Sequence, residues 1–302
     1  MNKRIGPSAR LKEELTAWRF LAPALLLLLT FLVAPFVMSV ILSFTNQRLV
    51  SPLPTRFVGL RNYVRLFGDA GFWQALKNTM LFAAVVVPLQ SGLALFLATL
   101  VNKRLPGRNL FRGIYFMPVV VPMVVVCVVW YFLLMYPEGL LNTFVQILTL
   151  GRAGPYDWLR NPSLALPTIM LVSIWQGVGF QMIVYLAGLQ NIPRELYEAA
   201  RIDGASSWGQ FLHITMPGLR NTHIFVLVTT TILAFKLFTQ VEVLTQGGPL
   251  GVTNTLVRYI YTAGYRELKV GYASAASVIF VLIVLTVSLV QRRLLREERE
   301  VG

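Results

Sequence analysis

Residues 190–221 read QNIPRELYEAARIDGASSWGQFLHITMPGLRN, a polar, amphipathic segment between two long apolar runs. Pro193 suits the first turn of a helix, and residues 194–201 are good helix formers. Asp203-Gly204 offers a turn, so we predict a second short helix that starts near Ser206 and ends at Pro217. Neither helix is long enough to cross about 30 Å of hydrocarbon. The segment is therefore predicted to form a compact knob outside the membrane, where it meets a partner.

The rest of the 302-residue chain has the composition of a membrane protein, with 56% hydrophobic and 13% charged residues. Soluble domains carry roughly half apolar and a quarter charged residues. Six runs approach the roughly 20 residues that a spanning helix needs: Phe20 to Phe44, Thr79 to Val101, Gly113 to Tyr136, Leu164 to Ala187, Ile224 to Leu244 and Tyr272 to Val290. We predict an all-α integral membrane protein with six transmembrane helices.

The distribution of Lys and Arg sets the expected orientation. With the N-terminus in the cytoplasm, sixteen of the 27 basic residues lie on the cytoplasmic side and ten on the outer side, and Lys236 lies within a span. The positive-inside rule favours this arrangement, which also places the knob in the cytoplasm. The expected organisation is a cytoplasmic tail (1–19), one six-helix transmembrane domain (20–292, with the knob loop at 190–220) and a cytoplasmic C-terminal tail (293–302).

The knob resembles the EAA loop of permease subunits of ATP-binding-cassette (ABC) importers. That pattern, EAAxxDGAxxxxxFxxIxxP, is present as Glu198-Ala199-Ala200, Asp203-Gly204-Ala205, Phe211, Ile214 and Pro217. In the family this loop is the coupling helix that docks into a cleft of the ATPase subunit. The resemblance implies an ATPase-coupling role for seven residues: Glu198, Ala199, Ala200, Asp203, Gly204, Ala205 and Pro217.

The resemblance extends from about Phe20 onward to the carbohydrate-uptake branch of these permeases. It is carried by VGLRNYVRLFGD near Val58, MPVVVP from Met117, AGLQNIP, TQGGP from Thr245 and GYASAAS from Gly271. TQGGP followed by TNTLVRYIYTAGY is more similar to the first permease, of maltose MalF or glycerol-phosphate UgpA type, than to its partner. This implies a MalF/MetI-like fold in a bacterial or archaeal plasma membrane. It also implies a second permease, two cytoplasmic ATPase subunits, an extracytoplasmic solute-binding protein, and an oligosaccharide, polyol or glycerol-phosphate type of solute.

A sugar-like solute presents hydroxyl groups, so its path should offer hydrogen-bonding side chains and aromatic or glycine surfaces. In the fourth span Ser173, Gln176, Gly177, Phe180 and Gln181 lie within about two turns. The resemblance to the maltose type implies a substrate path at Ser173, Gln176, Gly177, Phe180, Thr230, Leu233, Ala234 and Leu237. The fifth-span positions depart from that pattern, because several polar groups expected for maltose are apolar here. Lys236 either meets an anionic solute or snorkels toward an interface.

The source of energy is expected to lie outside this chain. No GxxxxGK[ST] phosphate loop occurs, so a partner subunit is expected to bind ATP and Mg, and this chain is expected to need no cofactor. A stand-alone secondary transporter, the alternative, would usually carry ionisable residues in its spans. Of the thirteen acidic residues only Glu242 falls in a predicted span. Glu242, like Gln240, is a candidate for an outer gate or a solvated helix end.

Other classes of function lack support in the sequence. His213 and His223 are interpreted as solvated loop residues; with no HExxH pair, GxSxG elbow or carboxylate cluster, no catalytic or metal site is expected. The single cysteine, Cys127, is expected to be a small buried apolar residue. The net charge of +14 is spread over loop ends, which favours anionic lipid headgroups over nucleic acid.

Prolines, glycines and arginines mark the remaining features. Pro118 and Pro122 predict a bent third span, and Gly247-Gly248-Pro249 predicts a turn that ends the fifth. The first apolar run is longer than a signal-peptide core and is interpreted as a retained helix. The loop Pro137 to Pro162 contains a predicted interfacial helix at Leu140 to Leu150. The first outer loop carries Arg48, Arg56, Arg61 and Arg65, which either form a surface for an acidic partner or are simply solvated.

Overall fold

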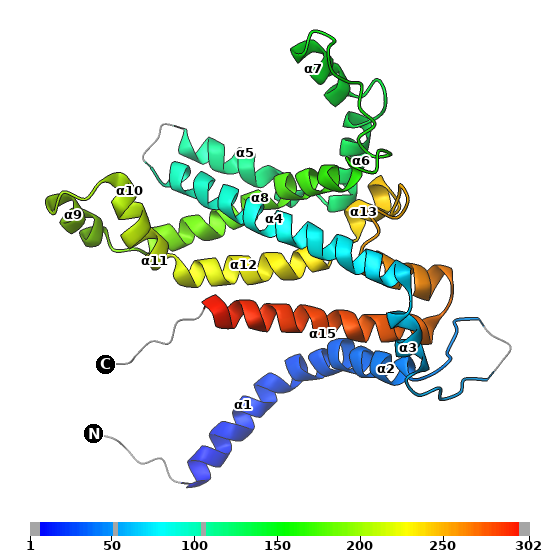
Figure 1. Cartoon of the computed structure of the whole chain (residues 1–302). Coiled ribbons are helices and arrows are strands. Elements are labelled where there is room, and N and C mark those ends of the chain that lie inside the picture. Colours follow the sequence, from blue (N-terminus) through cyan, green and yellow to red (C-terminus); the bar gives the residue numbers. More distant parts are fainter. Residues whose placement is uncertain (1–6, 51–53, 104–106, 296–302) are drawn as a thin grey trace. The chain divides into compact units, whose positions relative to one another are not determined.

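The computed structural model describes residues 7–50, 54–103 and 107–295, and most of this part is helical (Figure 1). Within it, the β-type pairing consists of one isolated bridge between Thr45 and Phe57. The chain divides into two compact units, one made of Met1–Gly68 with Ile260–Ile279 and the other of Asp69–Tyr259 with Phe280–Gly302. The predicted all-helical class is confirmed. The outer parts of the predicted tails, 1–6 and 296–302, lie outside the described residues.

The first unit begins with a long apolar helical run. It consists of α1 (Pro7–Leu28), the π-helical turn η1 (Leu29–Val33) and α2 (Ala34–Ser43). Residues Thr16–Ser43 are long and apolar enough to span a membrane, and none of their apolar window is buried within the chain. The unit also contains the short helix α3 (Arg61–Phe67), the turn η3 (Thr262–Arg266) and the first residues of α15 (Val270–Leu295).

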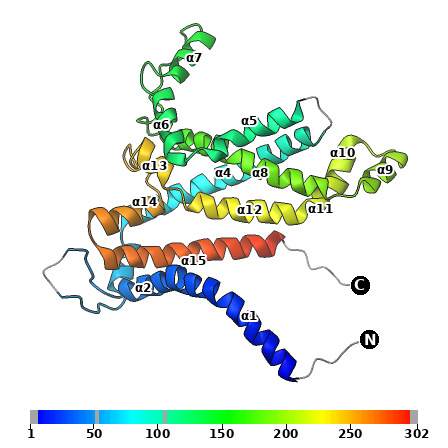
Figure 2. The ribbon, with the colours of Figure 1, turned by 180° about the vertical axis from the view of Figure 1, so that it is seen from behind.

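The second unit is a bundle of long helices. α4 (Ala70–Asn102), α5 (Arg108–Val120), α8 (Ala165–Gln190) and α12 (Arg220–Phe235) lie side by side in both views (Figures 1 and 2). α6 (Met123–Leu133) and α13 (Thr239–Leu244) pack against each other at one end of this bundle. α7 (Leu140–Leu148) lies within the predicted interfacial segment, and α14 (Leu256–Tyr261) leads out of the unit.

Small residues allow the helices of this bundle to approach closely. A Cβ added at Gly179 of α8 would lie 2.0 Å from the carbonyl oxygen of Tyr115 on α5. A Cβ at Gly188 would lie 2.5 Å from Oγ1 of Thr222 on α12. Between apolar helices in lipid, van der Waals packing at small residues is a main source of association. Glycine at these two positions is thus required by the packing of α8 against both neighbours.

The predicted bend in the third span is confirmed and is sharp. Leu110–Val120 and Met123–Leu133 meet at 99°. Pro122 precedes α6 as its N-cap, with extended backbone angles of φ −55° and ψ 134°, whereas Pro118 lies inside continuous α5. A proline lacks the N–H that a continuing helix needs, and it disfavours helical geometry in the preceding residue. Pro122 is therefore the residue at the break.

The number of spans agrees with the sequence. Five helical segments are long and apolar enough to cross a membrane, and the bent pair of α5 and α6 gives a sixth if it counts as one span. The segments are Thr16–Ser43, Ala70–Asn102, Ala165–Gln190, Arg220–Leu244 and Val270–Leu295. Most extend past the predicted bounds, because the helices continue into polar residues that a hydropathy window excludes.

Candidate functional site

The knob begins with α9 (Arg194–Ile202), which ends in a tightly defined cap. Gly204 has a positive φ of 78°. The N–H of Gly204 donates to the carbonyl of Arg201 (3.1 Å), and the N–H of Ala205 donates to that of Ala200 (2.8 Å). These two bonds are those of a Schellman cap, which places a glycine at the left-handed position. The DGA element of the motif thus fixes the direction in which the chain leaves α9.

A second cap starts the return helix at once. The Ser206 Oγ accepts from the N–H of Gly209 (3.1 Å) and caps α10 (Ser207–Gln210). The Gln210 Nε2 donates to the carbonyl of Ala205 (3.0 Å), which braces the turn. The Tyr197 hydroxyl lies 2.9 Å from Oγ1 of Thr215, so a hydrogen bond connects the two arms. The knob is a defined structure, with a hydrogen bond at each change of direction.

The prediction that Pro217 ends the second helix was wrong. α10 continues through the π-helical turn η2 (Phe211–Thr215) into α11 (Met216–Gly218), which contains Pro217. The N–H of Met216 reaches back five residues to the carbonyl of Phe211. Pro217 lies at the start of α11, where the hydrogen-bond register changes. Its missing N–H is therefore tolerated, and the helical conformation continues through this residue.

The knob exposes apolar side chains on an otherwise polar surface. Ile202 is 87% exposed, Trp208 67% and Leu196 51%. No residue of α9 or α10 is buried. Among the predicted coupling residues, Ala200 is half-buried and the other six are exposed: Glu198, Ala199, Asp203, Gly204, Ala205 and Pro217. In both views the knob lies at one end of the pair α8 and α12, whereas α13 lies at the opposite end of that pair (Figures 1 and 2).

Two polar contacts join α8 to the fifth span inside the bundle. The Gln181 Nε2 lies 2.5 Å from Oγ1 of Thr230, and both side chains are buried. The Gln240 Nε2 lies 3.3 Å from Oγ of Ser173, which also donates to the carbonyl of Ile169 (2.8 Å). Gln240, considered above for a gate, is therefore tied to a predicted path residue. Hydrogen bonds of this kind hold helices in register within a membrane.

The predicted path residues fall into three groups. Ser173, Thr230, Ala234 and Leu237 are buried within the bundle, and Gln176 and Gly177 are half-buried. Phe180 is 43% exposed, Leu233 is 59% exposed, and Lys236 is also exposed. A Cβ at Gly177 would lie 2.3 Å from Nε2 of Gln90 on α4, so this glycine accommodates a buried amide. Of the predicted path residues, Phe180, Leu233 and Lys236 are therefore the three with exposed side chains in this conformation.

The fifth span is interrupted at Lys236. α12 ends at Phe235, and α13 starts at Thr239. The hydroxyl of Thr255 donates to the carbonyl of Leu237 (2.8 Å), which satisfies a backbone group in the gap. Lys236 is the C-cap of α12, where a cation interacts favourably with the helix dipole. The sequence did not predict this break, because no proline or glycine marks it.

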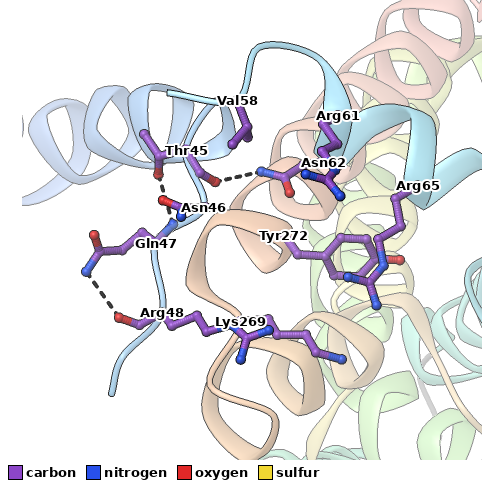
Figure 3. Close-up of a pocket in the computed structure, with 10 residues that line it drawn as sticks. All are labelled: Thr45, Asn46, Gln47, Arg48, Val58, Arg61, Asn62, Arg65, Lys269 and Tyr272. Atoms are coloured by element: carbon purple, nitrogen blue, oxygen red, sulfur yellow. Dashed lines mark hydrogen bonds between the residues drawn. The ribbon is translucent and has the colours of Figure 1, made fainter. Parts of the chain in front are cut away.

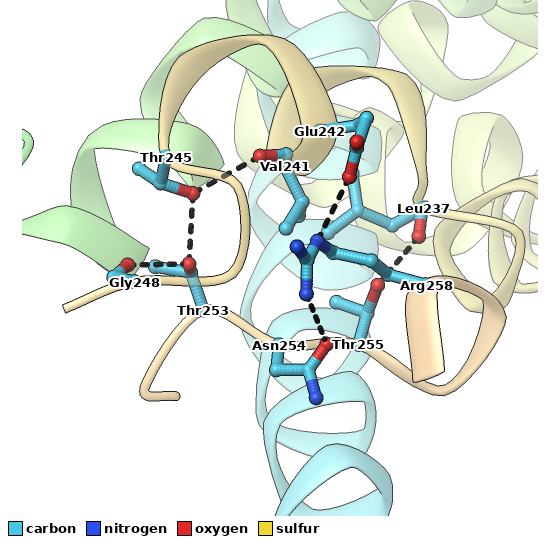
Figure 4. A network of polar contacts seen from close by, with 9 residues as sticks. All are labelled: Leu237, Val241, Glu242, Thr245, Gly248, Thr253, Asn254, Thr255 and Arg258. Carbon is cyan, nitrogen blue, oxygen red and sulfur yellow. Dashed lines mark hydrogen bonds and ion pairs between the residues drawn. The ribbon is translucent and has the colours of Figure 1, made fainter. Parts of the chain in front are cut away.

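A polar network organises the TQGGP turn after α13 (Figure 4). The Thr253 Oγ1 donates to the carbonyl of Gly248 (2.6 Å) and lies 2.8 Å from Oγ1 of Thr245. The Arg258 guanidinium bonds Glu242 through Nε (2.9 Å) and Asn254 through Nη1 (3.1 Å). The predicted turn at Gly247-Gly248-Pro249 is confirmed, and its stability depends on residues that follow it.

Glu242 is therefore not a solvated helix end. Its carboxylate forms an ion pair with Arg258, and the two side chains are only 21% and 10% exposed respectively. A Cβ at Gly247 would lie 2.5 Å from Nη1 of Arg258, so the guanidinium lies directly against this glycine. Nothing in the sequence indicated this pair, because Glu242 and Arg258 lie 16 positions apart on two different helices, α13 and α14.

The histidine interpretation was half right. His213 is exposed, although it lies in η2 rather than in a loop. His223 lies in α12, and its Nδ1 is 3.0 Å from the hydroxyl of buried Tyr185 on α8. Nε2 of His223 is buried, and no described residue forms a hydrogen bond with it. Cys127 is fully buried, as predicted.

The described residues thus form a helical bundle with membrane-spanning segments and a capped, exposed knob at one end. Residues 90–300 match the family described as "binding-protein-dependent transport system inner membrane component". The chain belongs to this family.

Relatives similar over nearly their whole length support the assignment. The chain is 37% identical over 290 residues to the lactose transport system permease protein LacF of Rhizobium radiobacter, covering 95% of this chain and 96% of that protein. It is 33% identical over 301 residues to the trehalose/maltose transport system permease protein MalF of Thermococcus litoralis, covering 99% and 100%. It is 34% identical over 286 residues to the sulfoquinovosyl glycerol transport system permease protein SmoG of Agrobacterium fabrum, covering 95% and 92%.

The fold is shared with a solved transporter. A chain of a bacterial alginate ABC transporter, in complex with a pentasaccharide-bound periplasmic protein, superposes with a TM-score of 0.83 at 23% identity, covering 95% of this chain and 96% of that one. This chain is accordingly a multi-pass permease subunit of a binding-protein-dependent ABC importer. It is non-catalytic, and a separate subunit hydrolyses ATP.

Proposed function

We propose that this chain forms half of the pathway for a sugar or sugar-like solute and is driven through the knob by a cytoplasmic ATPase. The complete importer would contain a second permease, two ATPase subunits that bind ATP and Mg, and an extracytoplasmic solute-binding protein. The observation that carries the coupling role is the apolar surface of the knob. Ile202 and Trp208 are exposed on either side of the capped turn between α9 and α10, and no residue of these two helices is buried.

An exposed apolar pair on a rigid polar scaffold has the character of an interface core. Apolar and aromatic anchors surrounded by polar residues contribute most of the energy at protein interfaces. Glu198 and Asp203 are exposed beside these anchors and supply such a polar rim. The caps at Gly204 and Ser206 keep the anchors fixed, which reduces the entropy lost on docking.

The test of coupling is an exchange of one exposed side chain. Ile202→Glu is expected to weaken ATPase binding roughly 30-fold, the loss of an interface anchor worth about 2 kcal/mol. Leu250→Glu is the matched control, because Leu250 is 86% exposed in the turn that follows α13 and lies outside the knob. Co-purification in detergent measures the association. An Ile202→Glu protein that keeps both its ATPase and its uptake would exclude the knob as the coupling surface.

The solute class rests on the relatives and on exposed groups of α8 and α12. Lactose, trehalose or maltose, and sulfoquinovosyl glycerol name the systems of three relatives. Phe180 offers an aromatic face of the kind that stacks on a sugar ring, while Lys236 offers a cation for anionic solutes. We assign the exposed part of the path to Phe180, Leu233 and Lys236. The buried members, among them Ser173 and Thr230, support these helices from behind.

The path assignment is tested by uptake into proteoliposomes that contain the complete importer. Phe180→Ala is expected to lower solute uptake roughly tenfold, the loss of about 1 to 2 kcal/mol of ring contact, with ATPase association unchanged. The control is Leu171→Ala, which removes a 54% exposed side chain from α8. Leu171 precedes Phe180 by two and a half turns and so lies on the opposite face of the helix. Equal uptake by the two variants would contradict the assignment.

A further inference from the structure

A basic pocket of about 460 Å³ lies within the first unit (Figure 3). Arg48, Arg61, Arg65 and Lys269 line it, and the remaining lining residues include no acidic side chain. Its volume falls in the range of ligand sites in proteins, about 300–1,000 Å³. The pocket is formed by segments far apart in the sequence, the loop after α2, the helix α3 and the start of α15.

The walls of this pocket are fixed by hydrogen bonds. The Asn62 Nδ2 donates to the carbonyls of Ser43 and Thr45, each at 2.8 Å. The N–H of Gly271 donates to the carbonyl of Gln47 (2.8 Å). A Cβ at Gly271 would lie 2.1 Å from the carbonyl oxygen of Thr45, so only glycine permits this contact. The cations therefore project from a built scaffold.

The charges in this pocket are poorly compensated. Arg48, Arg61 and Arg65 form no ion pair within the part of the chain that the structure describes, whereas Lys269 pairs with Glu267 at 2.6 Å. The Arg65 guanidinium lies over the ring of Tyr272, 5.2 Å from its centre. Like charges gathered in one concavity repel one another unless an anion is present. Guanidinium groups favour phosphate oxygens, which they bind through two parallel N–H donors.

The position of the pocket indicates where that anion comes from. The span Thr16–Ser43 ends just before Thr45, and the span Val270–Leu295 begins next to Lys269. The pocket thus lies where two spans leave the hydrocarbon, at the depth of the lipid headgroups. Basic pockets between spanning helices hold anionic headgroups on the cytoplasmic side of membranes, and guanidinium groups bind phosphate by the same chemistry at the outer side, where the expected orientation places this pocket. We propose that this pocket binds the phosphate group of an anionic phospholipid.

The experiment compares purified wild-type protein with Arg61→Gln/Arg65→Gln. Two readouts are compared. One is the amount of phosphatidylglycerol that stays bound through detergent purification, and the other is thermal stability in detergent micelles supplied with either phosphatidylglycerol or phosphatidylcholine. The variant is expected to bind phosphatidylglycerol roughly 25-fold more weakly, about fivefold for each arginine. Arg56→Gln/Arg152→Gln is the control, because it removes the same charge at two exposed positions outside the pocket and should behave as wild type.

The arms of this experiment separate the alternatives. Inorganic phosphate alone is expected to stabilise wild-type protein much less than phosphatidylglycerol does. If phosphate gives the whole effect, a free anion occupies the pocket and the lipid assignment fails. If the pocket variant retains as much phosphatidylglycerol as the control does, the site is not a lipid site. In that case a loss of association with the solute-binding protein, measured by co-purification, would identify the pocket as a surface for that protein. The proposed coupling and solute roles are unaffected by either outcome.

Discussion

Replacing Gly204 with valine is expected to abolish most of the ATP-driven uptake while the chain still folds and inserts. Gly204 has a φ of 78°, and no heavy atom lies within 4 Å of the position that a Cβ would take. The effect of a side chain is therefore conformational, not steric. A left-handed backbone costs an ordinary L-residue about 1–2 kcal/mol, and a β-branched one more. Forcing this residue out of that region breaks the Schellman cap and redirects the return helix.

The measurement is uptake per ATP hydrolysed in proteoliposomes. We expect Gly204→Val to lower this ratio at least roughly tenfold, the equivalent of 1.4 kcal/mol. Gly204→Asn is expected to keep most of the activity, because asparagine tolerates the left-handed conformation better than any residue other than glycine. Gly209→Ala, in a helical part of the same knob, is expected to be neutral. Equal losses in the valine and asparagine variants would show that backbone geometry is not the cause.

Local signals in the sequence predicted the elements well. Asp203-Gly204 predicted the turn, Pro118 and Pro122 together predicted the bend in the third span, and the long apolar runs predicted the spans. Each of these features depends on residues close together in the chain. A left-handed glycine or a proline restricts its own backbone, so the prediction needs no knowledge of the tertiary structure.

Features that depend on distant residues were missed. His223 and Tyr185 lie 38 positions apart, and their contact exists only because α8 and α12 pack together. The basic pocket combines Arg48, Arg61 and Arg65 with Lys269, although the sequence left open whether these arginines were simply solvated. Pro217 was misjudged because the adjacent π-helical turn changes the register of hydrogen bonds. The spacing of residues along the chain does not predict contacts of this kind.

The ion pair between Glu242 and Arg258 is a missed long-range contact with a large expected effect on stability. Removing one member of a buried pair leaves the other charge uncompensated, which costs about 3–5 kcal/mol. Glu242 keeps 21% of its side chain exposed, so we expect about 3 kcal/mol for Arg258→Met, at the lower end of that range. Arg258 also bonds Asn254 and covers Gly247, so the TQGGP turn should loosen with it.

A double-mutant cycle separates the ion pair from these other contacts. Glu242→Gln, Arg258→Met and the double variant are compared by thermal unfolding in detergent, with solute uptake as the second readout. The double variant is expected to be more stable than the sum of the two single losses predicts, because it leaves no buried charge unpaired. Strict additivity would mean that the carboxylate and guanidinium do not stabilise each other. In that case Arg258 would support the turn only through Asn254 and its packing on Gly247.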